Sequence, residues 1–138
     1  MTGEPRYPLF ETATDRLTTT SGLEFDALTV EAIVSGDVTM AEFRITAGVL
    51  HQQAAIARQS GRATLARNFE RAADLVDIPD EVIFEIYELL RPGRAESKQV
   101  LCDLATRLRD AFGASEIAAF IEQAALAYEA RSLYRPRF

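Results

Sequence analysis

The sequence predicts an all-α protein, a small helical bundle of about three to five longer helices that follows an irregular N-terminal arm. Apolar residues recur at helical spacing in three segments of the second half of the chain. Glycines and prolines bound these segments, and the short connections favour antiparallel neighbours. No segment alternates apolar and polar residues as a strand would. The helical stripes are Val82, Ile83, Ile86, Tyr87 and Leu90; Val100, Leu101, Leu104, Ala105, Leu108 and Phe112; and Ile117, Phe120, Ile121, Ala124 and Tyr128.

Residues 1–25 form the predicted arm, because they are rich in proline, glycine and threonine and show no sustained helical or strand period. The arm holds more apolar side chains than a linker needs, so we expect it to become ordered against a partner. Residues 1–45 carry eight acidic and three basic residues, whereas residues 46–138 carry thirteen and twelve. We therefore expect two domains, an irregular N-terminal arm with short helices over 1–45 and a helical bundle domain over 46–138.

Two short helices are predicted before residue 45. One covers residues 28–35 and is ended by Gly36, which can adopt the left-handed conformation that stops a helix. The other covers residues 40–44, where Thr39 can cap the first turn and Glu42 completes a capping box.

Residue types at the ends of the longer helices set their predicted boundaries. Thr46 can act as an N-cap by accepting a hydrogen bond from the first turn. Pro79 opens another helix, because proline is tolerated only near a helix start. Helices should end at Gly61, Pro92-Gly93 and Gly113. The longer predicted helices span about residues 47–60, 62–76, 80–91, 95–112 and 115–133.

The chemistry-bearing residues form no recognisable active site. His51 and Cys102, the only histidine and cysteine, lie on separate predicted helices. We expect His51 to be a surface or interface residue and Cys102 to be inert and half-buried. An acidic face could bind a cation, but acids near a helix start more often face solvent or arginines; its members are Asp77, Asp80, Glu81, Glu85 and Glu88. We predict no catalytic, cofactor-binding or metal-binding residue on this chain.

The charge balance and the lack of long apolar runs exclude two further classes of partner. A net charge of −6 and an isoelectric point near 4.8 would repel nucleic-acid phosphates. No apolar run is long enough to span a bilayer, and the first residues show no export signal. We expect a cytoplasmic protein that binds neither nucleic acid nor membrane.

Several sequence blocks occur in a fixed order over residues 7–131. The blocks are Y-P-L at 7–9, L-T-V-E at 28–31, S-G-D-V-T at 35–39, R-I-T at 44–46, N-F-E-R-A-A-D-L at 68–75, I-P-D-E at 78–81, E-I-Y at 85–87 and A-A-F-I at 118–121. In this order and spacing they resemble the small (gamma) subunit of adenosylcobalamin-dependent diol and glycerol dehydratases. The chain departs from the family at Gly93, where a tyrosine is usual, and at its C-terminus, which lacks a lysine-rich ending.

The resemblance implies a heterohexamer that contains large, medium and small subunits in two copies each. The large subunit holds the diol, the large and medium subunits hold adenosylcobalamin, and the small subunit is structural. Radical elimination of water from a 1,2-diol such as propanediol or glycerol gives an aldehyde. The preferred diol and enclosure in a bacterial microcompartment stay open. The alternatives are a free-standing helical protein–protein interaction module and a small enzyme with an unrecognised carboxylate site.

A structural subunit should present apolar and arginine side chains to its partner. For the aromatics on the longer helices, burial in the internal core is the alternative. Arginines distinguish the two cases better, because arginine seldom fills a core without a carboxylate. Replacing Arg44 or Arg71 by alanine should therefore weaken assembly and leave unfolding of the free subunit unchanged. The candidate interface residues are Phe43, Arg44, Ile45, Phe69, Arg71, Tyr87 and Arg91.

Overall fold

The computed structural model describes residues 3–134 and confirms the all-α class. Within these residues there is no strand, and Thr18 and Glu24 form an isolated bridge. Contacts divide the chain into two compact units, Met1–Ala73 (the N-terminal unit) and Asp74–Phe138 (the C-terminal unit). This division lies inside a helix and not near residue 45, and the domain boundary expected from composition stays a prediction.

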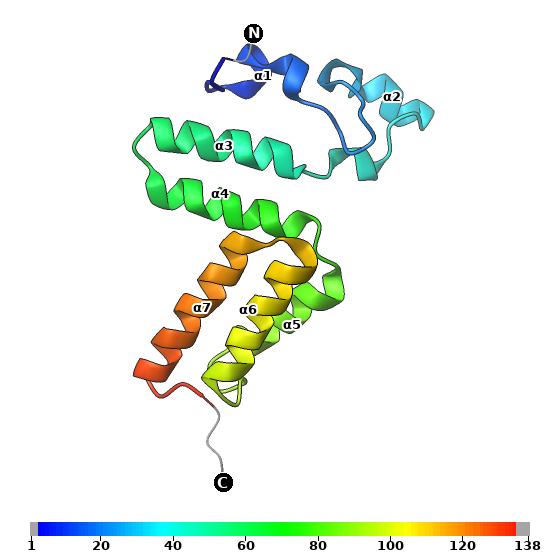
Figure 1. Cartoon of the computed structure of the whole chain (residues 1–138). Coiled ribbons are helices and arrows are strands. Elements are labelled where there is room, and N and C mark those ends of the chain that lie inside the picture. The colour runs from blue at the N-terminus through cyan, green and yellow to red at the C-terminus, as the bar shows by residue number, and fades with distance from the viewer. Residues whose placement is uncertain (1–2, 135–138) are drawn as a thin grey trace. The chain divides into compact units, whose positions relative to one another are not determined.

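The N-terminal unit is built from short helical turns followed by a longer helical hairpin (Figure 1). Helices α3 and α4 pack through small residues, with Ala54 and Ala57 of one against Ala66 of the other, and Phe69 lies against this cluster. α4 continues three residues beyond the division. The elements are α1 (Leu9–Thr12), the 3₁₀ turns η1 (Thr14–Arg16) and η2 (Phe25–Ala27), α2 (Val30–Ser35), the 3₁₀ turn η3 (Met40–Phe43), α3 (Ala47–Gln59) and α4 (Ala63–Val76).

The predicted ends of α2 and α3 are confirmed. Gly36 has a φ of 85° and ends α2 in the left-handed conformation. The Thr46 hydroxyl accepts a hydrogen bond of 3.3 Å from the Val49 N–H and so caps α3. Gly61, with a φ of 72°, follows the end of the same helix. α2 begins at Val30, two residues after the predicted start, because the Thr29 hydroxyl caps it by accepting a 3.2 Å hydrogen bond from the Ala32 N–H. Local sequence is therefore sufficient to place the end of α2 and the start of α3.

The predicted capping box at Thr39 is wrong. The segment after Thr39 forms the 3₁₀ turn η3 and not an α-helical turn, and the Thr39 side chain accepts no capping hydrogen bond. The Glu42 carboxylate instead accepts a hydrogen bond of 2.8 Å from the Ser21 hydroxyl. Glu42 thus connects η3 to the loop after residue 17. The two residues are 21 positions apart in sequence, so a local motif could not predict this contact.

The C-terminal unit contains α5 (Asp80–Leu90), α6 (Lys98–Phe112) and α7 (Ser115–Ala130) around a continuous apolar core. Leu101, Leu108 and Ile121 are its largest fully buried side chains. Polar contacts also join its helices: the Tyr128 hydroxyl donates to the Leu90 carbonyl, and Arg109 of α6 forms two 3.0 Å hydrogen bonds with the Glu122 carboxylate of α7.

Two predicted boundaries in the C-terminal unit differ by three residues. α6 begins at Lys98 and not at residue 95, because Ser97 has an extended backbone (φ −158°, ψ 165°) and the segment before it is held by tertiary contacts, with Ala95 buried and the Gly93 N–H donating to the Leu133 carbonyl. α7 ends at Ala130 and not at residue 133, because Ser132 adopts a left-handed φ of 54° and stops the helix without a glycine. Tertiary contacts and an unusual serine conformation override the sequence pattern here.

Candidate subunit interface

The two residues with potential nucleophilic or basic chemistry lie on different helices. His51 is exposed on α3, and Cys102 is half-buried on α6 beside the apolar core of the C-terminal unit. Both positions agree with the predicted environments. Over residues 3–134, no group of three or more histidine, cysteine or acidic side chains could hold a metal ion. No helix in that range is both long and apolar enough to cross a membrane.

The acidic face of α5 meets arginines, as the sequence interpretation favoured. Glu85 forms an ion pair with Arg107 of α6. Glu88 pairs with Arg91 at 3.1 Å and with Arg94 at 3.2 Å. These carboxylates are therefore neutralised within the unit, and each exposed pair adds little to stability. The candidate interface residue Arg91, which directly follows α5, already has Glu88 of that helix as a partner.

The exposed apolar side chains concentrate between residues 7 and 45. Val34 of α2 and Met40 of η3 are each 82% exposed, which is unusual for such side chains in a protein that acts alone. A patch of this kind typically marks a surface that another protein covers. The large apolar residues exposed in this segment are Tyr7, Phe10, Phe25, Val30, Ile33, Val34, Met40, Phe43 and Ile45.

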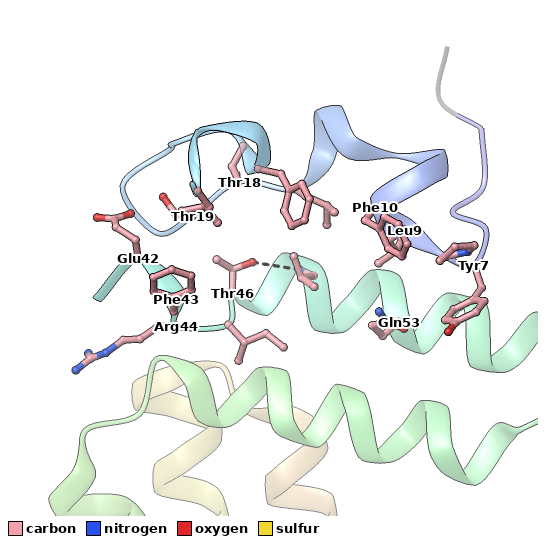
Figure 2. Close-up of a pocket in the computed structure, with 16 residues that line it drawn as sticks. Tyr7, Leu9, Phe10, Thr18, Thr19, Glu42, Phe43, Arg44, Thr46 and Gln53 are labelled. Atoms are coloured by element: carbon pink, nitrogen blue, oxygen red, sulfur yellow. Dashed lines mark hydrogen bonds between the residues drawn. The ribbon is translucent and has the colours of Figure 1, made fainter. Parts of the chain in front are cut away.

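Part of this surface is a groove of about 460 Å³ between the N-terminal arm and the start of α3. Figure 2 shows Tyr7 at one end of the groove and Phe43 and Arg44 at the other, with the Arg44 side chain pointing away from it. The structure thus brings Arg44 together with its sequence neighbours Phe43 and Ile45 and with arm residues. Its apolar lining is Tyr7, Pro8, Leu9, Phe10, Leu17, Phe25, Leu28, Phe43, Ile45 and Val49.

Hydrogen bonds fix the loop at the Phe43 end of the groove. Thr19 is the one polar residue that is buried within residues 3–134, and its hydroxyl accepts a bond of 3.1 Å from the Leu23 N–H. Hydrogen bonds from the hydroxyls of Thr19 and Ser21 lower the pKa of Glu42 below its ordinary value of 4.5, so this carboxylate is ionised at neutral pH as other glutamates are. The groove wall therefore carries a fixed negative charge beside an apolar surface.

The remaining candidate interface residues divide into two groups. Phe69 is half-buried against the small core between α3 and α4, which favours the internal-core alternative for it. Arg71 is also half-buried and donates a 3.1 Å hydrogen bond to Asn68 on its own helix. Tyr87 lies outside the core, with 67% of its surface exposed, so it is available to a partner and its place in the interface stays a prediction.

Sequence reasoning missed a second exposed aromatic beside Tyr87. Phe84 lies three residues earlier on α5 and is 72% exposed. Because residues three apart lie on one helical face, the two aromatics form an apolar patch. The spacing of Phe84 and Tyr87 was the available signal, but Phe84 lies outside the apolar stripe that predicted α5. Phe112 and Phe120, at the edges of the other stripes, are also more than one third exposed.

Comparison with known proteins identifies the family of this chain. A family model described as dehydratase small subunit matches residues 3–135. The chain belongs to the dehydratase small-subunit family. It is 40% identical over 125 residues to the propanediol dehydratase small subunit of Salmonella typhimurium and 41% identical to that of Citrobacter freundii. Each alignment covers 91% of this chain and 72% of the relative. Membership of a small-subunit family agrees with a chain that exposes an apolar surface.

Proposed function

We propose that this chain is a non-catalytic, structural small subunit of a coenzyme B12-dependent diol dehydratase. The complex would eliminate water from a 1,2-diol, propanediol or glycerol, to give an aldehyde. The single observation that carries the structural role is the accumulation of exposed apolar side chains between residues 7 and 45 in a member of a small-subunit family. Large and medium subunits are the proposed partners, in a heterohexamer.

The residues of this chain do not fit adenosylcobalamin, and we assign the cofactor to the partner subunits. When bound, adenosylcobalamin supplies the radical that starts the elimination. The groove beneath the arm, at about 460 Å³, suits a drug-sized molecule, and a corrinoid is larger. His51 is the only imidazole that could coordinate cobalt, and it is absent from the groove lining. The chain alone is therefore proposed to be inactive.

Co-expression with the large and medium subunits of a propanediol dehydratase tests the assignment. We expect a stable complex that forms aldehyde from a diol only when adenosylcobalamin is added. The matched control omits this chain and should lose assembly or activity. Failure of the wild-type chain to associate would favour a free-standing helical interaction module.

The non-catalytic role has its own test in the assembled complex. His51→Ala and Cys102→Ser should leave turnover within a few-fold of the wild-type complex, because the imidazole and the thiol lie on different helices and we expect neither to act in catalysis. A loss of about 10³-fold in a correctly assembled complex, which is the size expected for a missing general base, would contradict it.

A further inference from the structure

The groove between the arm and α3 combines an apolar floor with an acidic surrounding. Phe10, Phe43 and Ile45 contribute lining side chains that are each about half exposed. Glu42 lies in the wall of the groove, and hydrogen bonds from neighbouring hydroxyls lower the pKa of its carboxyl group. The exposed Glu24 and Asp26 flank the groove residue Phe25 in sequence. Arg44 also lines the groove, but its side chain points away from it. A ligand that offers apolar side chains to the groove and positive charge to these acids therefore matches the surface.

We propose that this groove binds a segment of a partner dehydratase subunit in which large apolar side chains are flanked by lysine or arginine. This inference rests on the proposed function and names the chemistry of the partner. Apolar side chains of the segment enter the groove, as anchors do in other grooves that bind peptide segments. Its cations meet an arm region that has eight acidic and three basic residues over positions 1–45.

Charge disfavours a second copy of this chain as the occupant. A symmetric dimer through this surface would place two regions of net charge −5 against each other. Like charges across an interface are costly and slow the encounter of the two molecules. The remainder of the chain has thirteen acidic and twelve basic residues, so its net charge of −1 does not compensate. A basic segment of a different subunit satisfies both the apolar and the electrostatic requirement.

Binding of purified variants to the purified complex of large and medium subunits tests the proposal. Phe10→Ser and Ile45→Ser remove apolar contacts from two sides of the groove, and both side chains are 54% exposed. Each should weaken binding by about 10-fold or more. Leu126→Ser is the matched control, because Leu126 lies on α7 with 56% exposure and is absent from the groove. It should change the dissociation constant by less than about 2-fold.

The electrostatic part has a separate readout. Raising the salt concentration from about 50 to about 500 mM should weaken wild-type binding, because exposed charges are screened. The double variant Glu24→Gln/Asp26→Asn should show a smaller salt dependence, while circular dichroism of every variant stays unchanged. If the double variant shows the same salt dependence as the wild type, the proposal that Glu24 and Asp26 attract cations of the partner segment is wrong.

The outcomes separate this inference from the proposed function. If the wild-type chain binds the other subunits and the two groove variants bind equally well, the groove proposal fails and the proposed function stands. If the wild-type chain does not bind at all, the proposed function fails. Sedimentation in which the wild type is a dimer and the groove variants are monomers would identify a second copy as occupant and overturn the inference.

Discussion

The two units of the molecule differ in how they bury apolar side chains. In the C-terminal unit the described core includes seven large aliphatic residues: Ile78, Ile86, Leu101, Leu104, Leu108, Ile117 and Ile121. In the N-terminal unit the buried apolar residues are mostly alanines, and the larger ones are Leu9, Val38 and Leu50. Full burial of one large aliphatic side chain contributes about 1.5–3 kcal/mol. The C-terminal unit thus has much more internal stabilisation than the N-terminal unit.

This difference favours the N-terminal unit as the part of the chain that contacts another subunit. The N-terminal unit leaves large apolar side chains such as Val34 and Met40 in solvent, whereas the C-terminal unit uses most of its own internally. Burying these exposed side chains against another subunit would supply the stabilisation that the N-terminal unit lacks. We therefore expect the C-terminal unit to be stable by itself and the N-terminal unit to gain stability from a partner.

The largest expected effect on the free subunit comes from the core of the C-terminal unit. Leu108→Ala should lower the free energy of unfolding by roughly 2–5 kcal/mol, because the side chain is fully buried. Val34→Ala on α2 should change it by less than about 0.5 kcal/mol. Urea unfolding of the isolated chain measures both. A Val34 effect as large as that of Leu108 would break the comparison between the units.

A smaller effect is expected at the start of α7. The Asp74 carboxylate accepts hydrogen bonds from the N–H groups of Glu116 and Ile117, at 2.8 and 3.0 Å, and so caps a helix that lacks its own side-chain cap. Asp74→Ala should cost about 0.5–2 kcal/mol, and Asp74→Asn should cost less because its amide oxygen can still accept. Thermal unfolding checks the order. Equal stability of all three proteins would show that the cap contributes nothing.

The smallest expected effect is a pH dependence within the C-terminal unit. The Arg109 guanidinium, through its hydrogen bonds, lowers the pKa of Glu122 below its ordinary value of 4.5. The pair therefore stabilises the fold above pH 4.5, and the stabilisation is lost as the pH falls through the lowered pKa. Wild type should exceed Glu122→Gln in stability by a small, constant amount between about pH 6 and 8. A difference that persists unchanged to pH 3 would exclude this linkage.

The fold was largely predictable because its signals are local. Thr46, Gly36 and Pro79 mark helix ends through their own side chains and backbone preferences, and the structure agrees. Thr39 and the start of α6 were not predictable, because Glu42 bonds to a distant serine and Ala95 is buried by tertiary contacts.

The candidate interface was predictable only in part. Phe43, Arg44 and Ile45 were identified from a short block, and the structure places them on one groove with the arm. Apolar character alone could not separate Phe69, which is half-buried in a core, from Tyr87, which is exposed. That distinction depends on which helical face meets another element, and a single sequence does not encode it in local spacing.

Amide hydrogen exchange of the free chain and of its complex with the large and medium subunits tests the central claim most directly. We expect the amides of residues 3–25 to exchange at least about 10-fold more slowly in the complex, while those of α6 and α7 change by less than about 2-fold. This result would show that the N-terminal arm gains its order from a partner. Equal protection of the arm in both states would contradict the account.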